Sequence, residues 1–144
     1  MDSMRKATTV LDDIKIHVKL KLSALWASVT LCYIYGDYFG LYKPGKLQGM
    51  LEGIMGPLGP ITQGVLLGPA ILMAIPSAMV FLSLSLKPNP NRWVNITLGV
   101  IFTVIMLITI PGAWAFYMFL GVVEVVLTAL IVWYAWNWPK QETT

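Results

Sequence analysis

Apolar residues gather in four long runs that are separated by short polar stretches. The runs cover residues 22–42, 62–86, 93–110 and 113–136. Each holds about 18 to 25 residues, enough for a helix that rises 1.5 Å per residue to cross roughly 30 Å of hydrocarbon. Because backbone groups in lipid must find their hydrogen-bond partners within the segment, the runs predict helices rather than strands. The sequence therefore predicts an all-α, polytopic membrane protein, a bundle of four transmembrane helices that forms one domain over residues 1–144.

The connections between the runs are short, except for the first. Only Pro111 and Gly112 separate the third and fourth runs, so these helices are predicted to be antiparallel neighbours. Between Lys46 and Pro60 the apolar residues recur with helical spacing, which predicts an amphipathic helix on the extracytoplasmic side. This segment has two interpretations, a helix lying in the membrane interface or a functional lid over the bundle.

Composition agrees with a membrane location, and the placement of charge predicts the orientation. The chain is 57% hydrophobic and 12% charged, with a mean hydropathy of +0.71, too little charge for the surface of a soluble domain. Eight of the ten Lys and Arg residues fall at the end that holds both termini, and only Lys43 and Lys46 fall at the other. Cytoplasmic loops carry such an excess of positive charge. We therefore predict a multi-pass protein of the inner (plasma) membrane with both termini in the cytoplasm, in contact with lipid and not with nucleic acid.

One carboxylate interrupts the first run, in the stretch YIYGDYFGLY over residues 33–42, and another lies in the fourth run. An ionised carboxylate facing lipid costs at least about 2.5–3.5 kcal/mol, so both acids are expected to face protein or water. Residues spaced three and four apart share a helix face, and this spacing places hydroxyl-bearing residues beside each acid. The predicted ligand-binding residues are Thr30, Tyr33 and Asp37 on the first helix and Tyr117, Glu124 and Thr128 on the fourth.

These polar residues have two interpretations. No Lys or Arg lies within the four runs, so neither acid has an obvious ion-pair partner. The residues either line a polar cavity that opens outward, or they are neutral acids and hydroxyls that hydrogen-bond the helices together, at about 0.6 kcal/mol per bond. The first interpretation predicts a ligand-binding or transport-related protein, and the second predicts only a structural role.

Several chemistries are excluded by the residue counts. The chain has one Cys and one His, too few for a Cys/His metal cluster, a bis-histidine haem or a Ser/His/Asp arrangement, and it has no Gly-rich phosphate loop. Cys32 lies in an apolar run and is interpreted as a small buried hydrophobe. We therefore expect no metal and no cofactor.

Two GxxxG motifs, Gly36–Gly40 and Gly64–Gly68, have the spacing that lets helix backbones approach closely in membranes. Four helices of this length enclose little volume, so the two motifs offer sites for self-association. We predict a homodimer or a small homo-oligomer.

Two segments are distinctive, Tyr35-Gly-Asp-Tyr38 and Pro111-Gly-Ala-Trp114. With them, nearly the whole chain resembles an uncharacterised bacterial family of small four-helix membrane proteins, known only as a domain of unknown function. More distantly, the architecture is similar to the DoxX-like group, some of whose members are membrane subunits of quinone-linked redox systems. No DoxX motif matches residue by residue, so the resemblance implies a fold and not an activity. Two alternatives to the binding or transport function therefore stay open: a membrane enzyme or redox-associated subunit handling a lipophilic substrate such as a quinone, and a structural partner of a larger membrane complex.

Overall fold

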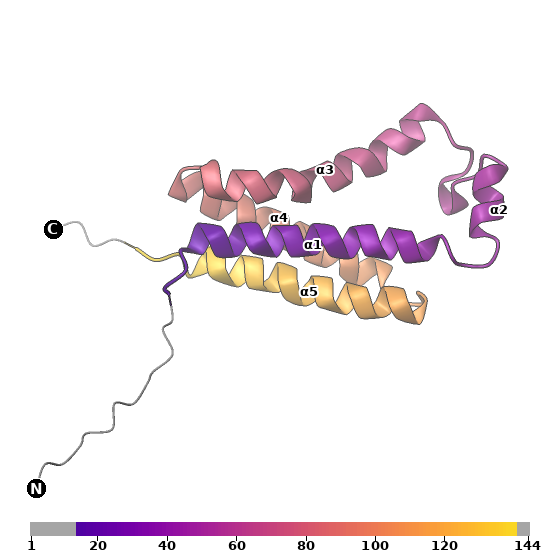
Figure 1. The fold of residues 1–144 in the computed structure, drawn as a ribbon. Coiled ribbons are helices and arrows are strands. Elements are labelled where there is room, and N and C mark those ends of the chain that lie inside the picture. The colour runs from indigo at the N-terminus through magenta and orange to yellow at the C-terminus, as the bar shows by residue number, and fades with distance from the viewer. Residues whose placement is uncertain (1–13, 141–144) are drawn as a thin grey trace, which may run out of the picture.

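The computed structural model describes residues 14–140, which form an all-α bundle of four long helices (Figure 1). These helices are α1 (Val18–Gly40), α3 (Gln63–Ser85), α4 (Pro88–Thr109) and α5 (Ala115–Trp136). Between α1 and α3 lie the six-residue helix α2 (Lys46–Leu51) and the 3-10 helix η1 (Gly56–Leu58). Across residues 14–140 the only β interaction is an isolated bridge between Ile54 and Pro60. The all-α prediction is confirmed.

Three of the long helices, α3, α4 and α5, are long and apolar enough to cross a membrane. Helix α1 has 23 residues but is not among them, because Asp37, two lysines and several tyrosines and serines lower its hydropathy. The chain is therefore a small membrane protein with three such helices among the described residues. That α1 also crosses the membrane, as a fourth span, stays a prediction.

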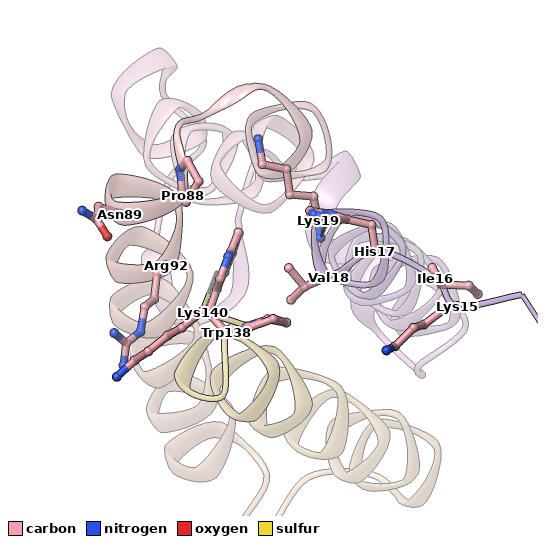
Figure 2. Close-up of a pocket in the computed structure, with 11 residues that line it drawn as sticks. Lys15, Ile16, His17, Val18, Lys19, Pro88, Asn89, Arg92, Trp138 and Lys140 are labelled. Carbon is pink, nitrogen blue, oxygen red and sulfur yellow. Dashed lines mark hydrogen bonds between the residues drawn. The ribbon is translucent and has the colours of Figure 1, made fainter. Parts of the chain in front are cut away.

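The helices α1 and α4 begin earlier than the apolar runs indicate. Helix α4 begins at Pro88 rather than near residue 93, because proline at the first helical position lacks only an N–H that would have no partner inside the helix. Helix α1 begins at Val18, where Nδ1 of His17 accepts a hydrogen bond from the backbone N–H of Lys19 at 3.2 Å. Figure 2 shows both helix starts at the same end of the bundle, where α5 ends. Each of the two helices thus carries an extra polar turn at this end.

The predicted amphipathic helix over residues 46–60 is wrong beyond its first six residues. Helix α2 ends at Leu51, and the three glycines that follow at positions 53, 56 and 59 have φ values of 75°, 50° and 79°. These left-handed conformations favour glycine and interrupt a right-handed helix. The backbone N–H of Ile61 donates to the carbonyl of Gly53 at 2.7 Å and closes the segment into a compact turn. Neither α2 nor η1 buries a residue, and their role as a lid or an interfacial segment stays a prediction.

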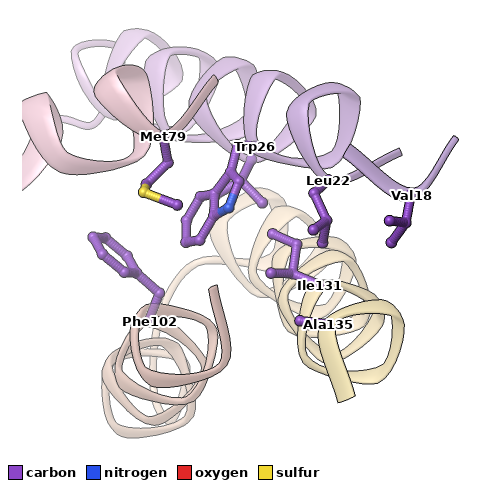
Figure 3. Packing of buried hydrophobic residues seen from close by; sticks show 8 residues of the cluster. Val18, Leu22, Trp26, Met79, Phe102, Ile131 and Ala135 are labelled. Atoms are coloured by element: carbon purple, nitrogen blue, oxygen red, sulfur yellow. The ribbon is translucent and has the colours of Figure 1, made fainter. Parts of the chain in front are cut away.

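Helix α1 packs against α3 and α5, and α5 packs against α4, whereas α3 and α4 contact each other only sparsely. The apolar core lies in the half of the bundle where α1 begins and α5 ends (Figure 3). At its centre the ring of Trp26 meets the ring of Phe102 edge to face, with centroids 5.9 Å apart. In α3 all buried residues fall at or after Pro76, and Figure 1 shows the first half of α3 bending away from α1. The bundle is therefore tightly packed at one end, and at the other end α3 packs only loosely.

Among the glycines, those with the closest neighbours on another helix or its end lie outside the GxxxG motifs. A Cβ atom added at Gly99 would lie 2.7 Å from Cγ2 of Val132, and one added at Gly121 would lie 2.6 Å from Cγ1 of Ile110. At Gly40, Gly64 and Gly68 an added Cβ would meet nothing within 4 Å, and at Gly36 only the end of Leu120, at 3.8 Å. The GxxxG motifs therefore do not mediate close packing within the chain. Self-association through them stays a prediction.

Candidate functional site

A pocket of about 190 Å³ lies in the loosely packed half of the bundle and is lined by residues of all four long helices. Helix α1 contributes Tyr33 and Asp37, and α5 contributes Tyr117 and Glu124. We call this the acidic pocket. Its other lining residues are mostly apolar: Gly36, Leu72, Met73, Ile105, Met106, Thr109 and Leu120. The structure thus brings four of the six predicted binding residues to one pocket, although whether they bind a ligand stays a prediction.

Glu124 is the most buried polar group of the acidic pocket, with 2% of its surface exposed. Its Oε2 atom is buried and has no hydrogen-bond partner among the described residues, and the same is true of the hydroxyl of Tyr33. A buried polar atom without a partner costs about 1–3 kcal/mol, and most such atoms in folded proteins are paired. The acidic pocket therefore contains two polar groups whose hydrogen-bonding capacity the described residues leave unused.

Asp37, the other acid of the acidic pocket, lies on α1 beside Tyr33 and has a different environment from Glu124. Its side chain is exposed although it lines the pocket, so the carboxylate lies where the pocket opens. One helical turn earlier, the ring of Tyr33 is held by Phe102, with centroids 6.0 Å apart. The two acids are thus placed differently, Asp37 at the opening and Glu124 in the interior.

The two predicted threonines do not line the acidic pocket. The hydroxyl of Thr30 donates to the carbonyl of Trp26 at 2.9 Å, one turn earlier in its own helix. Thr128 is fully buried, and its hydroxyl is 2.9 Å from the carbonyl of Glu124 and 2.7 Å from the hydroxyl of Thr103. The hydroxyl of Thr30 therefore forms its hydrogen bond within its own helix, whereas that of Thr128 also connects α5 to α4. Thr128 thus has the structural role that the second interpretation of the polar residues describes, whereas the hydroxyl of Thr30 connects no two helices.

A buried amide network connects three of the long helices through residues that are not among the predicted binding residues. The indole N–H of Trp26 donates to Oδ1 of Asn95 at 2.7 Å, and Nδ2 of Asn95 donates to Oδ1 of Asn91 at 2.7 Å. Nδ2 of Asn91 in turn donates to the carbonyl of Ser83 at 2.6 Å. The network therefore joins α1, α4 and α3. The spacing of Asn91 and Asn95, four residues apart, was the signal that would have placed them on one helix face.

The described residues offer no site for a metal ion built from three or more His, Cys, Asp or Glu side chains. What the acidic pocket does offer is two carboxyl groups and two phenol hydroxyls against apolar walls. Such a set of groups can bind a small molecule by hydrogen bonds and, when a carboxyl group is ionised, by charge.

The model of one protein family, described as a family of unknown function (DUF6326), matches residues 12–144. This agrees with the resemblance to an uncharacterised family noted above, while similarity to the DoxX-like group is not shown. No curated protein and no solved structure matches the chain.

Proposed function

We propose that this chain, which belongs to the DUF6326 family of unknown function, binds a small solute that donates hydrogen bonds, such as a primary amine, in the acidic pocket between α1 and α5. The observation that carries the proposal is the pair of unpartnered polar atoms at the pocket, Oε2 of Glu124 and the hydroxyl of Tyr33. A ligand that supplies the missing partners would remove the cost of leaving both atoms unpaired. Rotation of the carboxyl group exchanges its two oxygens, so either can face the ligand.

The chemistry of the lining residues indicates what kind of ligand fits. An ionised carboxylate only accepts hydrogen bonds, and a phenol hydroxyl both donates and accepts. No Lys or Arg is among the lining residues, so a positively charged or donating group is the natural partner for Glu124 and Asp37. A quinone carries only acceptors, which suits Tyr33 but not an ionised carboxylate. The pocket chemistry therefore favours a donor-bearing solute over the quinone alternative.

The volume of the pocket limits the size of the ligand. A cavity of about 150 Å³ accommodates a single benzene ring, whereas pockets for drug-sized ligands begin near about 300 Å³. At about 190 Å³, the acidic pocket suits a ligand of only a few heavy atoms. Asp37 at the opening and Glu124 in the interior provide two acceptors in series, an arrangement that also suits passage of the solute. Transport is therefore part of the proposal.

The proposal is tested by thermal unfolding of the purified protein in mild detergent, with methylamine or propylamine added at constant pH and ionic strength. A ligand present at 100 times its Kd stabilises the folded state by about 2.7 kcal/mol. We expect the amines to raise the Tm of the wild type more than propanol of matched length does, because propanol carries no charge and donates only one hydrogen bond. Glu124→Gln keeps the shape of the side chain but removes its charge, and it is expected to abolish the shift.

Glu52→Gln is the matched control, because Glu52 is an exposed carboxylate outside the acidic pocket that accepts a hydrogen bond from Gln48. It is expected to keep the full amine-dependent shift. Equal shifts for wild type and Glu124→Gln would refute the proposal, as would the absence of a shift with any amine. A quinone copurifying with the protein would favour the redox alternative instead.

A further inference from the structure

A second and larger pocket, of about 910 Å³, lies at the tightly packed end of the bundle (Figure 2). It is formed where α1 and α4 begin and where the chain leaves α5. We call it the basic pocket. Its lining residues are Lys15, Ile16, His17, Val18, Lys19, Pro88, Asn89, Arg92, Trp138, Pro139 and Lys140.

Charge distinguishes this pocket from an ordinary surface depression. Four of its lining residues are cations, and none of the lining residues is acidic. The acidic residues within the described range 14–140 are Asp37, Glu52 and Glu124, none of which lines this pocket. Each basic side chain near a membrane surface attracts anionic groups by about 1 kcal/mol. The basic pocket therefore gathers positive charge without a described acidic side chain to neutralise it.

The hydrogen-bond donors at the pocket are only partly used. Nζ of Lys19 donates to the carbonyls of Leu84 and Leu86, at 3.1 and 2.7 Å, and Arg92 donates through Nε and Nη2 to the carbonyls of Ala135 and Trp136. An ammonium carries three N–H donors and a guanidinium carries five, so each side chain has further N–H groups that these hydrogen bonds do not use. Lys15 and Lys140 are exposed and form no hydrogen bond within residues 14–140.

The direction of the helices adds to the positive potential. The N-termini of α1 and α4 both lie at the basic pocket, and the N-terminus of a helix carries about half a positive charge. Proline at positions 88 and 90 removes two N–H groups from the start of α4, so the side chains rather than the backbone provide most donors. Lys19 and Arg92 are fixed by their carbonyl contacts, whereas Lys15 and Lys140 extend from the segments that flank α1 and α5.

We propose that the basic pocket binds a phosphate-bearing anion, either the headgroup of an anionic lipid or a soluble phosphate compound. Phosphate oxygens accept several hydrogen bonds from Lys and Arg at once. The basic pocket lies where α4 begins and beyond the end of α5, two of the helices that are apolar enough to cross a membrane. The ends of such helices lie at the depth of the lipid headgroups. Its volume of about 910 Å³ exceeds what a single phosphate ion needs. This site is separate from the acidic pocket and does not depend on the function proposed above.

The test measures binding by native mass spectrometry of the full-length protein in a zwitterionic detergent. The probes are phosphatidylglycerol, phosphatidylcholine, glycerol 3-phosphate and inorganic phosphate. Replacing Lys15 and Lys140 together by glutamine removes two of the pocket's cations without breaking a hydrogen bond of the described chain. We expect the affinity for the bound anion to fall about thirty-fold, the factor that about 1 kcal/mol per removed cation gives. Replacing both lysines by arginine keeps the charge and is expected to keep the binding.

The control is the double variant Lys21→Gln and Lys87→Gln, which removes the same charge from the same end of the bundle. Neither lysine lines the basic pocket, and Lys21 lies instead over the ring of Tyr134, at 4.9 Å. We expect this variant to bind within about three-fold of the wild type. Binding of phosphatidylglycerol alone assigns the site to a lipid headgroup, and equally tight binding of glycerol 3-phosphate or inorganic phosphate assigns it to a soluble phosphate. Equal loss in both double variants, or no preference for any phosphate anion over phosphatidylcholine, would overturn the proposal.

Discussion

Replacement of Gly99 by alanine tests a close contact between α4 and α5. The added Cβ atom would lie 2.7 Å from Cγ2 of Val132 and 3.4 Å from both Cγ2 of Ile131 and the carbonyl oxygen of Thr128. Separations below 3.0 Å are essentially never seen for a real Cβ atom. Either the side chain of Val132 must move in a well-packed interface or the two helices must separate.

Two opposing effects determine how much Gly99→Ala changes the free energy of unfolding. Adding a methyl group to a well-packed core costs about 1–3 kcal/mol, while alanine in place of glycine within a helix contributes about 1 kcal/mol of stability. We therefore expect Gly99→Ala to lower the free energy of unfolding by up to about 2 kcal/mol. At Gly36 the added Cβ would meet only Cδ1 of Leu120, at an ordinary 3.8 Å, so Gly36→Ala is expected to raise the free energy of unfolding by about 1 kcal/mol.

The assay is reversible unfolding in mixed micelles, followed by circular dichroism, with both alanine variants measured under the same conditions. The two variants are expected to differ by about 1–3 kcal/mol, with Gly99→Ala the less stable. Adding Val132→Ala to Gly99→Ala removes the atom in closest contact and is expected to recover part of the loss. If Gly99→Ala is as stable as Gly36→Ala, the packing of α4 against α5 described above is wrong.

Two further predictions concern the buried amides and the orientation. Asn95→Leu leaves the indole N–H of Trp26 without its acceptor, so we expect it to lower the free energy of unfolding by about 1–3 kcal/mol. This loss of stability should be smaller in a Trp26→Phe background. An unchanged loss in that background would contradict the hydrogen bond. In a Cys32→Ala background, a membrane-impermeant thiol reagent applied from outside is expected to label a cysteine placed at Gln48 and not one placed at Asn89. The reason is that positive charge gathers at the end of the bundle that holds Asn89. The reverse labelling pattern would invert the predicted topology.

The sequence predicts the long helices well because their formation depends on long apolar runs, and a single polar residue within such a run does not obscure it. It predicts their ends less well. The prolines at 88 and 90 read as a connection, yet the first turn of a helix accommodates proline, and α4 begins there. The segment after Leu51 shows the opposite error, because helical spacing of apolar residues continues past glycines that take left-handed conformations. Backbone conformation at glycine is not visible in the periodicity of its neighbours.

The acidic pocket was partly predictable, and the packing contacts were not. Face arguments placed Tyr33 and Asp37 together on α1, and Tyr117 and Glu124 together on α5, and the structure brings the two pairs to one pocket. They could not tell that Thr128 would pair with Thr103 across the helices, because this depends on the rotation of α5 against α4. The same holds for Gly99: a motif of two glycines attracts notice, whereas a single glycine at a contact carries no sequence signature.

The sparse contact between α3 and α4 has a mechanical consequence. Helices α1, α5 and α4 form a continuous series of well-packed neighbours, whereas α3 is joined to it mainly through α1 and, at the tight end, through the hydrogen bond from Asn91 to Ser83. The first half of α3, up to Ile75, has no fully buried residue, and only its last part, through Leu72 and Ile75, packs against the apolar core. Leu72 and Met73 belong to this half and form part of the wall of the acidic pocket. A displacement of this arm against the other three helices would therefore change the volume of that pocket.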